Sequence, residues 1–194
     1  MIKAATKTQR HRDLLIRGLC AFVSLWLISL CVLRPLGAQS SPVIVVETTK
    51  GTFEIETYPN EAPKTVAHIV GLVKAGFYDG QRVHRALSGF VVQWGDPRSR
   101  DTTQAFDWGK GPAASSGQPI GAAEITKKRT HVTGAVAVAH LGNPAQADSQ
   151  IYVTLADRPD LNGKYAVFGR VTNGDEVPGL LVRGDQIRRM TVKN

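Results

Sequence analysis

Residues 83–97 read VHRALSGFVVQWGDP, and this stretch holds two short apolar runs on either side of Ser88-Gly89. Short apolar runs bounded by turn residues are typical of β-strands. Arg85 lies inside the first run and Gln93 inside the second. Guanidinium groups are costly to bury without partners, so we expect Arg85 to have either a structural ion pair or a ligand.

The sequence on both sides of this stretch also predicts mostly β-strands. A β-branched run at 43–46 and an alternating run at 52–56, joined by a turn, predict a hairpin. This many short strands with few helices favours a mainly β domain, built as a closed antiparallel barrel capped by helices. The sequence shows no internal repeat and no linker between domains. The remaining strands are predicted at 83–87, 90–94, 135–139, 150–155, 166–171 and 187–192.

Two helices and one long loop complete the predicted domain. Pro63 begins a segment whose apolar residues recur at helical spacing, and Gly76 follows its end. A shorter helix is predicted at 177–181. Residues 96–119 are rich in glycine, proline and serine and predict a loop. A loop of this length in a compact domain is usually functional or flexible.

Residues 1–38 differ in composition from the rest of the chain. They hold six of the 24 Lys and Arg residues but only one of the 16 Asp and Glu residues, so most of the net charge of +8 lies there. An uncharged run at 18–33 follows the basic stretch, as in a secretory signal peptide. We predict cleavage after Ala38. The alternatives are a retained signal anchor that tethers the protein through residues 14–33, and a buried helix of the domain. A signal peptide or an anchor would place the domain outside the cytoplasmic membrane, in the periplasm or secreted.

Several kinds of chemistry are not expected in the domain that follows, residues 39–194. Both cysteines, Cys20 and Cys31, fall in the leader, which leaves the domain without a thiol for disulfides, zinc or nucleophilic catalysis. The five histidines show no ligand spacing, and the common hydrolase and phosphate-loop motifs are missing. We therefore expect no metal and no cofactor. With the leader set apart, basic and acidic residues nearly balance, so nucleic-acid binding is not expected.

The order of the motifs resembles the cyclophilin-type peptidyl-prolyl cis-trans isomerases, in a bacterial, exported form. Residues 83–97 resemble the family signature, in which Phe-His-Arg-Val-Ile and Gly-Phe-Met-x-Gln-Gly-Gly-Asp follow one another. The resemblance covers about residues 43–192 and implies one eight-stranded antiparallel barrel capped by two helices. The other matching segments are APKTV at 62–66, GAVAVA at 134–139, DSQIYV at 148–153 and LNGKYAVFGRV at 161–171.

The resemblance also implies roles for ten residues. Arg85 matches the catalytic arginine of the family. The implied activity is rotation about X-Pro bonds to assist the folding of exported proteins, with proline-containing polypeptides as partners and a monomer as the working form. A proline-peptide-binding chaperone module of the same fold without turnover is the alternative. The remaining matches are Phe90, Val91, Tyr152 and Leu161 as walls of the proline pocket, Gln93, Ala139, His140 and Gln150 along the substrate groove, and Tyr165 at its rim.

Some positions depart from the family pattern. Trp94 stands where a glycine is usual, and we expect its indole to pack away from the groove because it alternates with Gln93 along the strand. Asp160 stands where some members carry a tryptophan, so we expect weakened cyclosporin binding. We expect such changes to alter substrate preference and affinity more than chemistry. The other replacements are Val91 for methionine, Tyr152 for phenylalanine, His140 for asparagine and Tyr165 for histidine.

Overall fold

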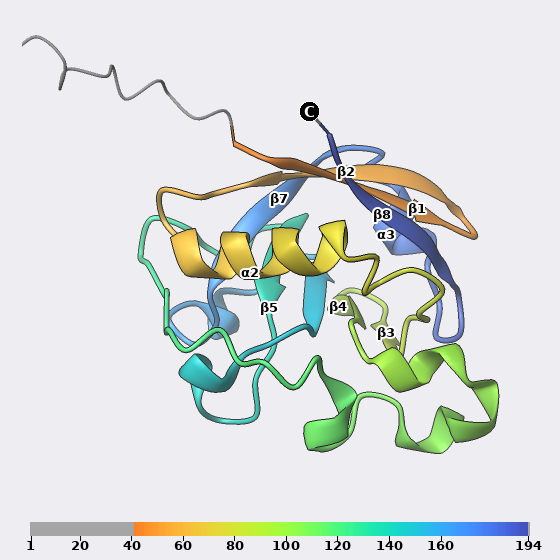
Figure 1. Ribbon diagram of the computed structural model, residues 1–194. Helices are drawn as coiled ribbons and strands as arrows, with labels where there is room; N and C mark the ends of the chain where they lie inside the picture. The colour runs from red at the N-terminus through yellow and green to blue at the C-terminus, as the bar shows by residue number, and fades with distance from the viewer. Residues whose placement is uncertain (1–40, 194) are drawn as a thin grey trace, which may run out of the picture. The chain divides into compact units, whose positions relative to one another are not determined.

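A computed structural model describes residues 41–193 of the chain, in which strands predominate over helices (Figure 1). The α-helices are α2 Pro63–Lys74 and α3 Val177–Leu180. Five short 3-10 helices are η1 Pro97–Arg100, η2 Thr102–Asp107, η3 Pro112–Ala114, η4 Pro144–Gln146 and η5 Pro159–Leu161. The strands are β1 Val43–Thr48, β2 Gly51–Thr57, β3 Arg85–Leu87, β4 Val91–Trp94, β5 Ala135–Val138, β6 Ile151–Thr154, β7 Val167–Asn173 and β8 Ile187–Lys193.

The eight strands form one curled antiparallel sheet in the order β3-β4-β6-β5-β7-β2-β1-β8. The end strands β3 and β8 do not pair, so the prediction of a closed barrel is wrong in this respect. The segments ahead of these two strands meet through an isolated bridge between Arg82 and Gln186. The contact ends before β3 begins, because the last backbone hydrogen bond between these two segments joins the Gly184 amide to the Val83 carbonyl, at 2.9 Å. The fold is therefore mainly β, and its sheet is open, with β3 and β8 as edge strands.

Helix α2 lies on the inner side of the curled sheet, against β8 (Figure 1). Its first residue, Pro63, has a φ suited to the first helical turn and lacks an amide that would need a partner. The backbone amides of Lys64 and Thr65 donate to the Glu124 carboxylate at 3.0 and 2.8 Å, so a distant loop caps the helix. The buried residues of α2 are Thr65, Val66, Ile69, Val70 and Val73.

Alternation along β4 separates two apolar clusters. Val92 and Trp94 face the main core, where the fully buried indole of Trp94 packs edge-to-face on Phe53 with ring centroids 6.2 Å apart. Val91 and Gln93 face the opposite side, and Val91 belongs to a second, smaller cluster. Trp94 therefore packs away from the groove, as predicted. The other buried members of the second cluster are Ala135, Ala137, Tyr152 and Val167.

The predicted leader, residues 1–38, lies outside the described residues, and so does the possible tether at 14–33. Contacts group the chain from Ser41 onward into one compact unit. Within residues 41–193, no helix combines the length and the apolar character needed to cross a membrane.

Candidate functional site

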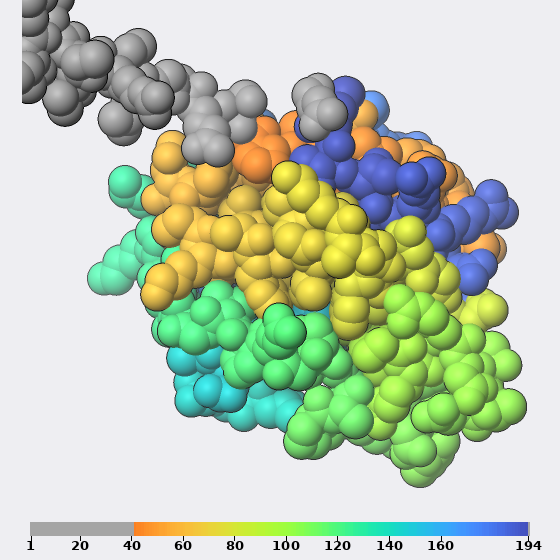
Figure 2. Space-filling model, viewed as in Figure 1, coloured from red at the N-terminus to blue at the C-terminus, as the bar shows by residue number. Residues whose placement is uncertain are grey.

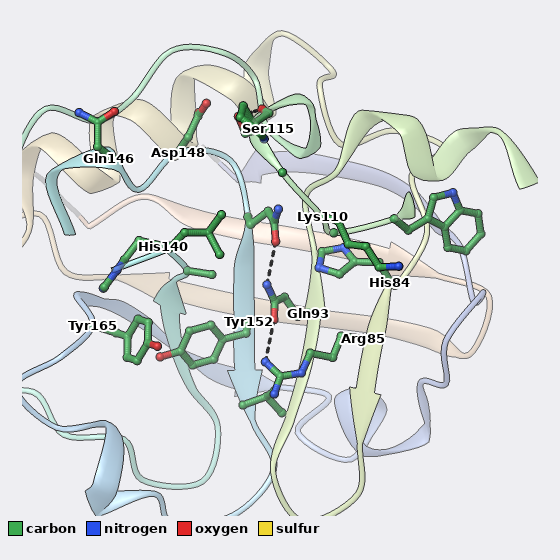
Figure 3. A pocket seen from close by; sticks show the side chains of 18 of the residues that line it. His84, Arg85, Gln93, Lys110, Ser115, His140, Gln146, Asp148, Tyr152 and Tyr165 are labelled. Carbon is green, nitrogen blue, oxygen red and sulfur yellow. Dashed lines mark hydrogen bonds between the residues drawn. The ribbon is translucent and has the colours of Figure 1, made fainter. Parts of the chain in front are cut away.

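The ten residues to which the family resemblance assigns a role all line one cavity, of about 1230 Å³ (Figure 3). They come from β3, β4 and the turn between them, from β6 and the residue before it, from the loop after β5, and from η5 and the loop that follows it. Residues distant in the sequence are thus brought to one concave surface by the sheet order. These residues are Arg85, Phe90, Val91, Gln93, Ala139, His140, Gln150, Tyr152, Leu161 and Tyr165.

A row of polar side chains crosses the floor of this cavity. Arg85 and Gln93 are paired across β3 and β4, and Arg85 Nη1 approaches Gln93 Oε1 at 3.5 Å, a long hydrogen bond. Gln93 Nε2 donates to Gln150 Oε1 at 2.8 Å, and Gln150 Nε2 donates to the carbonyl of Ala114 at 2.8 Å. These bonds fix the orientation of both amides, so the row is aligned before any ligand arrives (Figure 3).

Arg85 itself is exposed and has donors to spare. Among residues 41–193 it forms no ion pair with a carboxylate. Its contacts are the long bond to Gln93 and the ring of Phe90, whose centroid lies 5.2 Å from the guanidinium carbon. Of the two partners that the sequence allowed, a structural ion pair or a ligand, the geometry favours the ligand.

An apolar recess adjoins the Arg85 guanidinium. Phe90, Leu161 and Tyr165 are partly buried side chains packed against the cluster that contains Val91 and Tyr152. A second cation, which the sequence did not indicate, packs on Phe90 but does not line the cavity. The Arg158 guanidinium lies 4.1 Å from the centroid of the Phe90 ring and is held there by two hydrogen bonds of 2.9 Å to Asp160. Asp160 therefore positions the Arg158 guanidinium over the Phe90 ring.

Behind the recess, a buried histidine orients the Tyr152 ring. The backbone amide of His131 and its Nδ1 both lie within hydrogen-bond distance of Asn162 Oδ1, at 2.8 and 3.0 Å. Because a carbonyl oxygen accepts hydrogen bonds, Nδ1 carries the proton, and Nε2 accepts from the Tyr152 hydroxyl at 2.9 Å. Burial lowers the pKa of His131 and raises that of Tyr152, so both stay neutral at pH 7.

The sequence did not indicate the roles of His131 and Asn162. The available signal was the hydroxyl of Tyr152, because a buried tyrosine normally finds a hydrogen-bond partner. That signal does not say which of the five histidines is the hydrogen-bond partner of Tyr152.

His140 and Tyr165 form the opposite rim of the recess. Their rings lie 4.6 Å apart, and Tyr165 also meets Tyr152 edge-to-face at 5.8 Å. His140 Nε2 donates to the carbonyl of Lys164 at 2.9 Å. The Ala139 amide donates to the carbonyl of Gln150 at 2.8 Å, which ties the loop after β5 to the start of β6. This rim is therefore a fixed aromatic wall.

His84 lines the cavity beside Arg85. It is 7% exposed, and neither ring nitrogen has a hydrogen-bond partner among residues 41–193. Burial lowers its pKa to about 4, so the ring is neutral at pH 7. Gly109 packs on this ring with a φ of 77°, and a Cβ there would lie 2.5 Å from Cδ2 of His84. The close approach of the loop to His84 therefore requires glycine at position 109.

The long segment 96–119 is held against the site by two carboxylates. Fully buried Asp96 accepts from the amides of Arg98 and Gly109 at 2.9 and 2.7 Å and pairs with the Arg98 guanidinium. Asp148 accepts from Ser116 Oγ and from the Gln118 amide. Figure 2 shows this segment, in green, forming the surface below α2, in yellow. The predicted loop is therefore a folded wall with three short 3-10 helices.

Within residues 41–193, no group of three or more His, Cys, Asp or Glu side chains lies close enough to hold a metal ion. The predicted site residues provide the Arg85 guanidinium, two oriented amides and an apolar recess. Its chemistry is donation of hydrogen bonds to a bound ligand.

Comparison with known proteins identifies the group to which this site belongs. The family described as cyclophilin type peptidyl-prolyl cis-trans isomerase/CLD matches residues 43–190. A probable peptidyl-prolyl cis-trans isomerase of Brucella abortus is 33% identical over 157 residues, which cover 81% of this chain and 80% of that protein. Peptidyl-prolyl cis-trans isomerase B of Bacillus subtilis is 36% identical over 141 residues, covering 73% and 90% respectively.

A solved structure shares the fold. The crystal structure of a cyclophilin type peptidyl-prolyl cis-trans isomerase from Cryptosporidium parvum matches with a TM-score of 0.69 at 24% identity, covering 79% of this chain and 98% of that one. That protein also has a crystal structure in the presence of the dipeptide Ala-Pro. By the extent of the family match and the identity to its relatives, this chain belongs to the cyclophilin-type peptidyl-prolyl cis-trans isomerases.

Proposed function

We propose that this chain catalyses rotation about X-Pro bonds and that Arg85 is its catalytic residue. The observation that carries the proposal is the unpaired guanidinium of Arg85 beside the recess formed by Phe90, Tyr152 and Leu161, in one cavity. The recess has the apolar character that a proline ring requires. Gln93 and Gln150 extend from it as oriented amides that can bond the flanking peptide backbone.

The physics of the reaction explains why these groups suffice. Rotation about an X-Pro bond faces a barrier of about 18–20 kcal/mol because the twisted amide loses its resonance. No covalent bond forms or breaks, so a catalyst must bind the twisted state better than either planar state. Twisting makes the prolyl nitrogen pyramidal and basic. A permanently charged donor aimed at that nitrogen therefore stabilises the twisted state selectively.

Exchange of a proline peptide between cis and trans, followed by NMR, tests the proposal. We expect Arg85→Ala to lower kcat/KM by about 100-fold, the loss typical of removing one preorganised donor. Arg158→Ala, which removes the neighbouring cation, is the matched control and should retain most of the turnover. Equal rates in wild type and Arg85→Ala would instead support the alternative, a proline-binding chaperone module without catalysis.

We also propose that the substrates are exported proteins. The support is the basic and then apolar composition of residues 1–38 and the lack of cysteine in residues 39–194. Mass spectrometry of the purified mature protein tests this. A first residue at Gln39 indicates a cleaved signal peptide, and an intact leader in the membrane fraction indicates the tether at 14–33. An intact leader in the cytoplasmic fraction would contradict export.

A further inference from the structure

The cavity continues beyond the recess for proline, on the side of His84 and Lys110. Figure 3 shows these two residues on one side of Gln93 and Arg85, away from Tyr165. This extension forms a side lobe of the cavity. None of the side-lobe residues was assigned a role from the sequence. Its lining residues are His84, Ala105, Phe106, Trp108, Gly109, Lys110 and Arg183.

Two cations of the side lobe rest on aromatic rings. The Lys110 ammonium lies 3.7 Å from the centroid of the Phe106 ring, and the Arg183 guanidinium carbon lies 5.1 Å from that of Trp108. Arg183 is anchored further by bonds from Nε to the carbonyl of His84, at 3.0 Å, and from Nη2 to the carbonyl of Ala105. Both positive groups are therefore positioned by the protein.

Neither cation is neutralised by the protein. Within residues 41–193, Lys110 and Arg183 form no ion pair with a carboxylate, and Arg183 Nη1 makes no hydrogen bond. The Phe106 ring, which is 82% exposed, adds an apolar surface beside them. A positive field over an apolar surface favours a ligand that carries a carboxylate on a short aliphatic stem.

Among the described residues, no carboxylate lines the side lobe. Asp148 is the one acidic residue among the described cavity residues, and Figure 3 shows it at the other end, near Ser115. Asp96 is buried and bound by Arg98, and Asp107 does not line the cavity. Asp148 is fully engaged within the protein. Its partners are His68 Nε2, Ser116 Oγ and the amide of Gln118.

We propose that the side lobe binds the carboxylate of an aspartate or glutamate close to the proline of the substrate. The proposal rests on the proposed function, because it assigns a preference to the same cavity. Lys110 and Arg183 are then specificity-determining residues, and the preferred substrates are acidic proline-containing segments. Both groups are solvent-accessible, so the preference is modest and depends on salt.

Matched peptides test this directly. Each pair carries glutamate or glutamine at one position, and the four pairs sample the two positions before and the two after the proline. NMR exchange gives kcat/KM, and chemical-shift titration of the same samples gives Kd. We expect glutamate to be favoured about fivefold at one of the four positions at low salt. The preference should nearly vanish in about 1 M salt, where the Debye length is about 3 Å.

Two charge reversals separate a local effect from a general one. Lys110→Glu should invert the glutamate-to-glutamine ratio at the preferred position. Lys74→Glu, which makes the same charge change at the end of α2 outside the cavity, should preserve it. Equal values for glutamate and glutamine at all four positions, or a preference that survives in Lys110→Glu, would overturn the inference.

A failure of the proposed isomerase function would give a different result from a failure of the carboxylate preference. Wild-type protein would then turn over none of the eight peptides, whatever their charge. The ratio of Kd values would still decide whether the side lobe selects carboxylates.

Discussion

The two faces of β4 place neighbouring residues under different physical demands. Trp94 and Val92 are buried among apolar side chains, and the Trp94 indole nitrogen has no hydrogen-bond partner in the described part of the chain. Gln93 and Val91 face the cavity, where Gln93 bonds both Arg85 and Gln150. The inner face contributes to stability through close packing, whereas the outer face holds polar groups in fixed directions. Trp94, which stands where the family pattern has glycine, is accommodated because its side chain falls on the inner face.

The largest effect on stability is expected at Trp94. Trp94→Ala leaves a cavity beside Phe53 and should lower the free energy of unfolding by about 3–5 kcal/mol, measured by urea denaturation. The matched control is Phe106→Ala on the exposed side lobe, which should stay within about 0.5 kcal/mol of wild type. A similar loss in both variants would contradict the separation of the two faces. The folded fraction of Trp94→Ala should keep the isomerase activity of wild type.

A somewhat smaller effect is expected at His84, beneath the outer face. Its pKa is about 4 in the folded protein and about 6.5 when unfolded. Between these values the unfolded state binds a proton that the folded state does not. Stability is therefore complete above pH 6.5 and falls by about 3 kcal/mol as the pH drops to 4.

His84→Gln removes this titration. The difference in unfolding free energy between wild type and His84→Gln should shift by about 3 kcal/mol, in favour of the variant, from pH 6.5 to pH 4. His131, whose pKa burial also lowers, is present in both proteins and cancels in the difference. A difference that does not change with pH would show that His84 is not buried as a neutral ring.

The smallest effect is expected from one hydroxyl group. Tyr152→Phe removes the donor to His131 Nε2 and should cost about 1 kcal/mol of unfolding free energy. Tyr165→Phe is the control, because the Tyr165 hydroxyl makes no hydrogen bond within the described residues, and it should be nearly neutral. Equal costs for the two changes would contradict the orientation of Tyr152 by His131.

Local alternation and spacing predicted the strands and α2, and the family resemblance supplied ten residues that all line the cavity. The sequence did not predict that the sheet stays open, since this depends on the contact between Arg82 and Gln186, about a hundred residues apart. The positions of Arg158 and His131 also escaped prediction. Their roles depend on contacts with Phe90 and Tyr152 that arise from the fold, and no spacing in the sequence encodes them.

The central claim is that Arg85 stabilises the twisted X-Pro bond, and Arg85→Lys tests it most directly. NMR exchange and titration on one proline peptide measure the interconversion rate of the bound peptide and its Kd in the same sample. Lysine keeps the charge but loses the planar fork of donors. We predict a Kd close to that of wild type and an interconversion rate lower by about 100-fold. An unchanged interconversion rate in Arg85→Lys would contradict the claim.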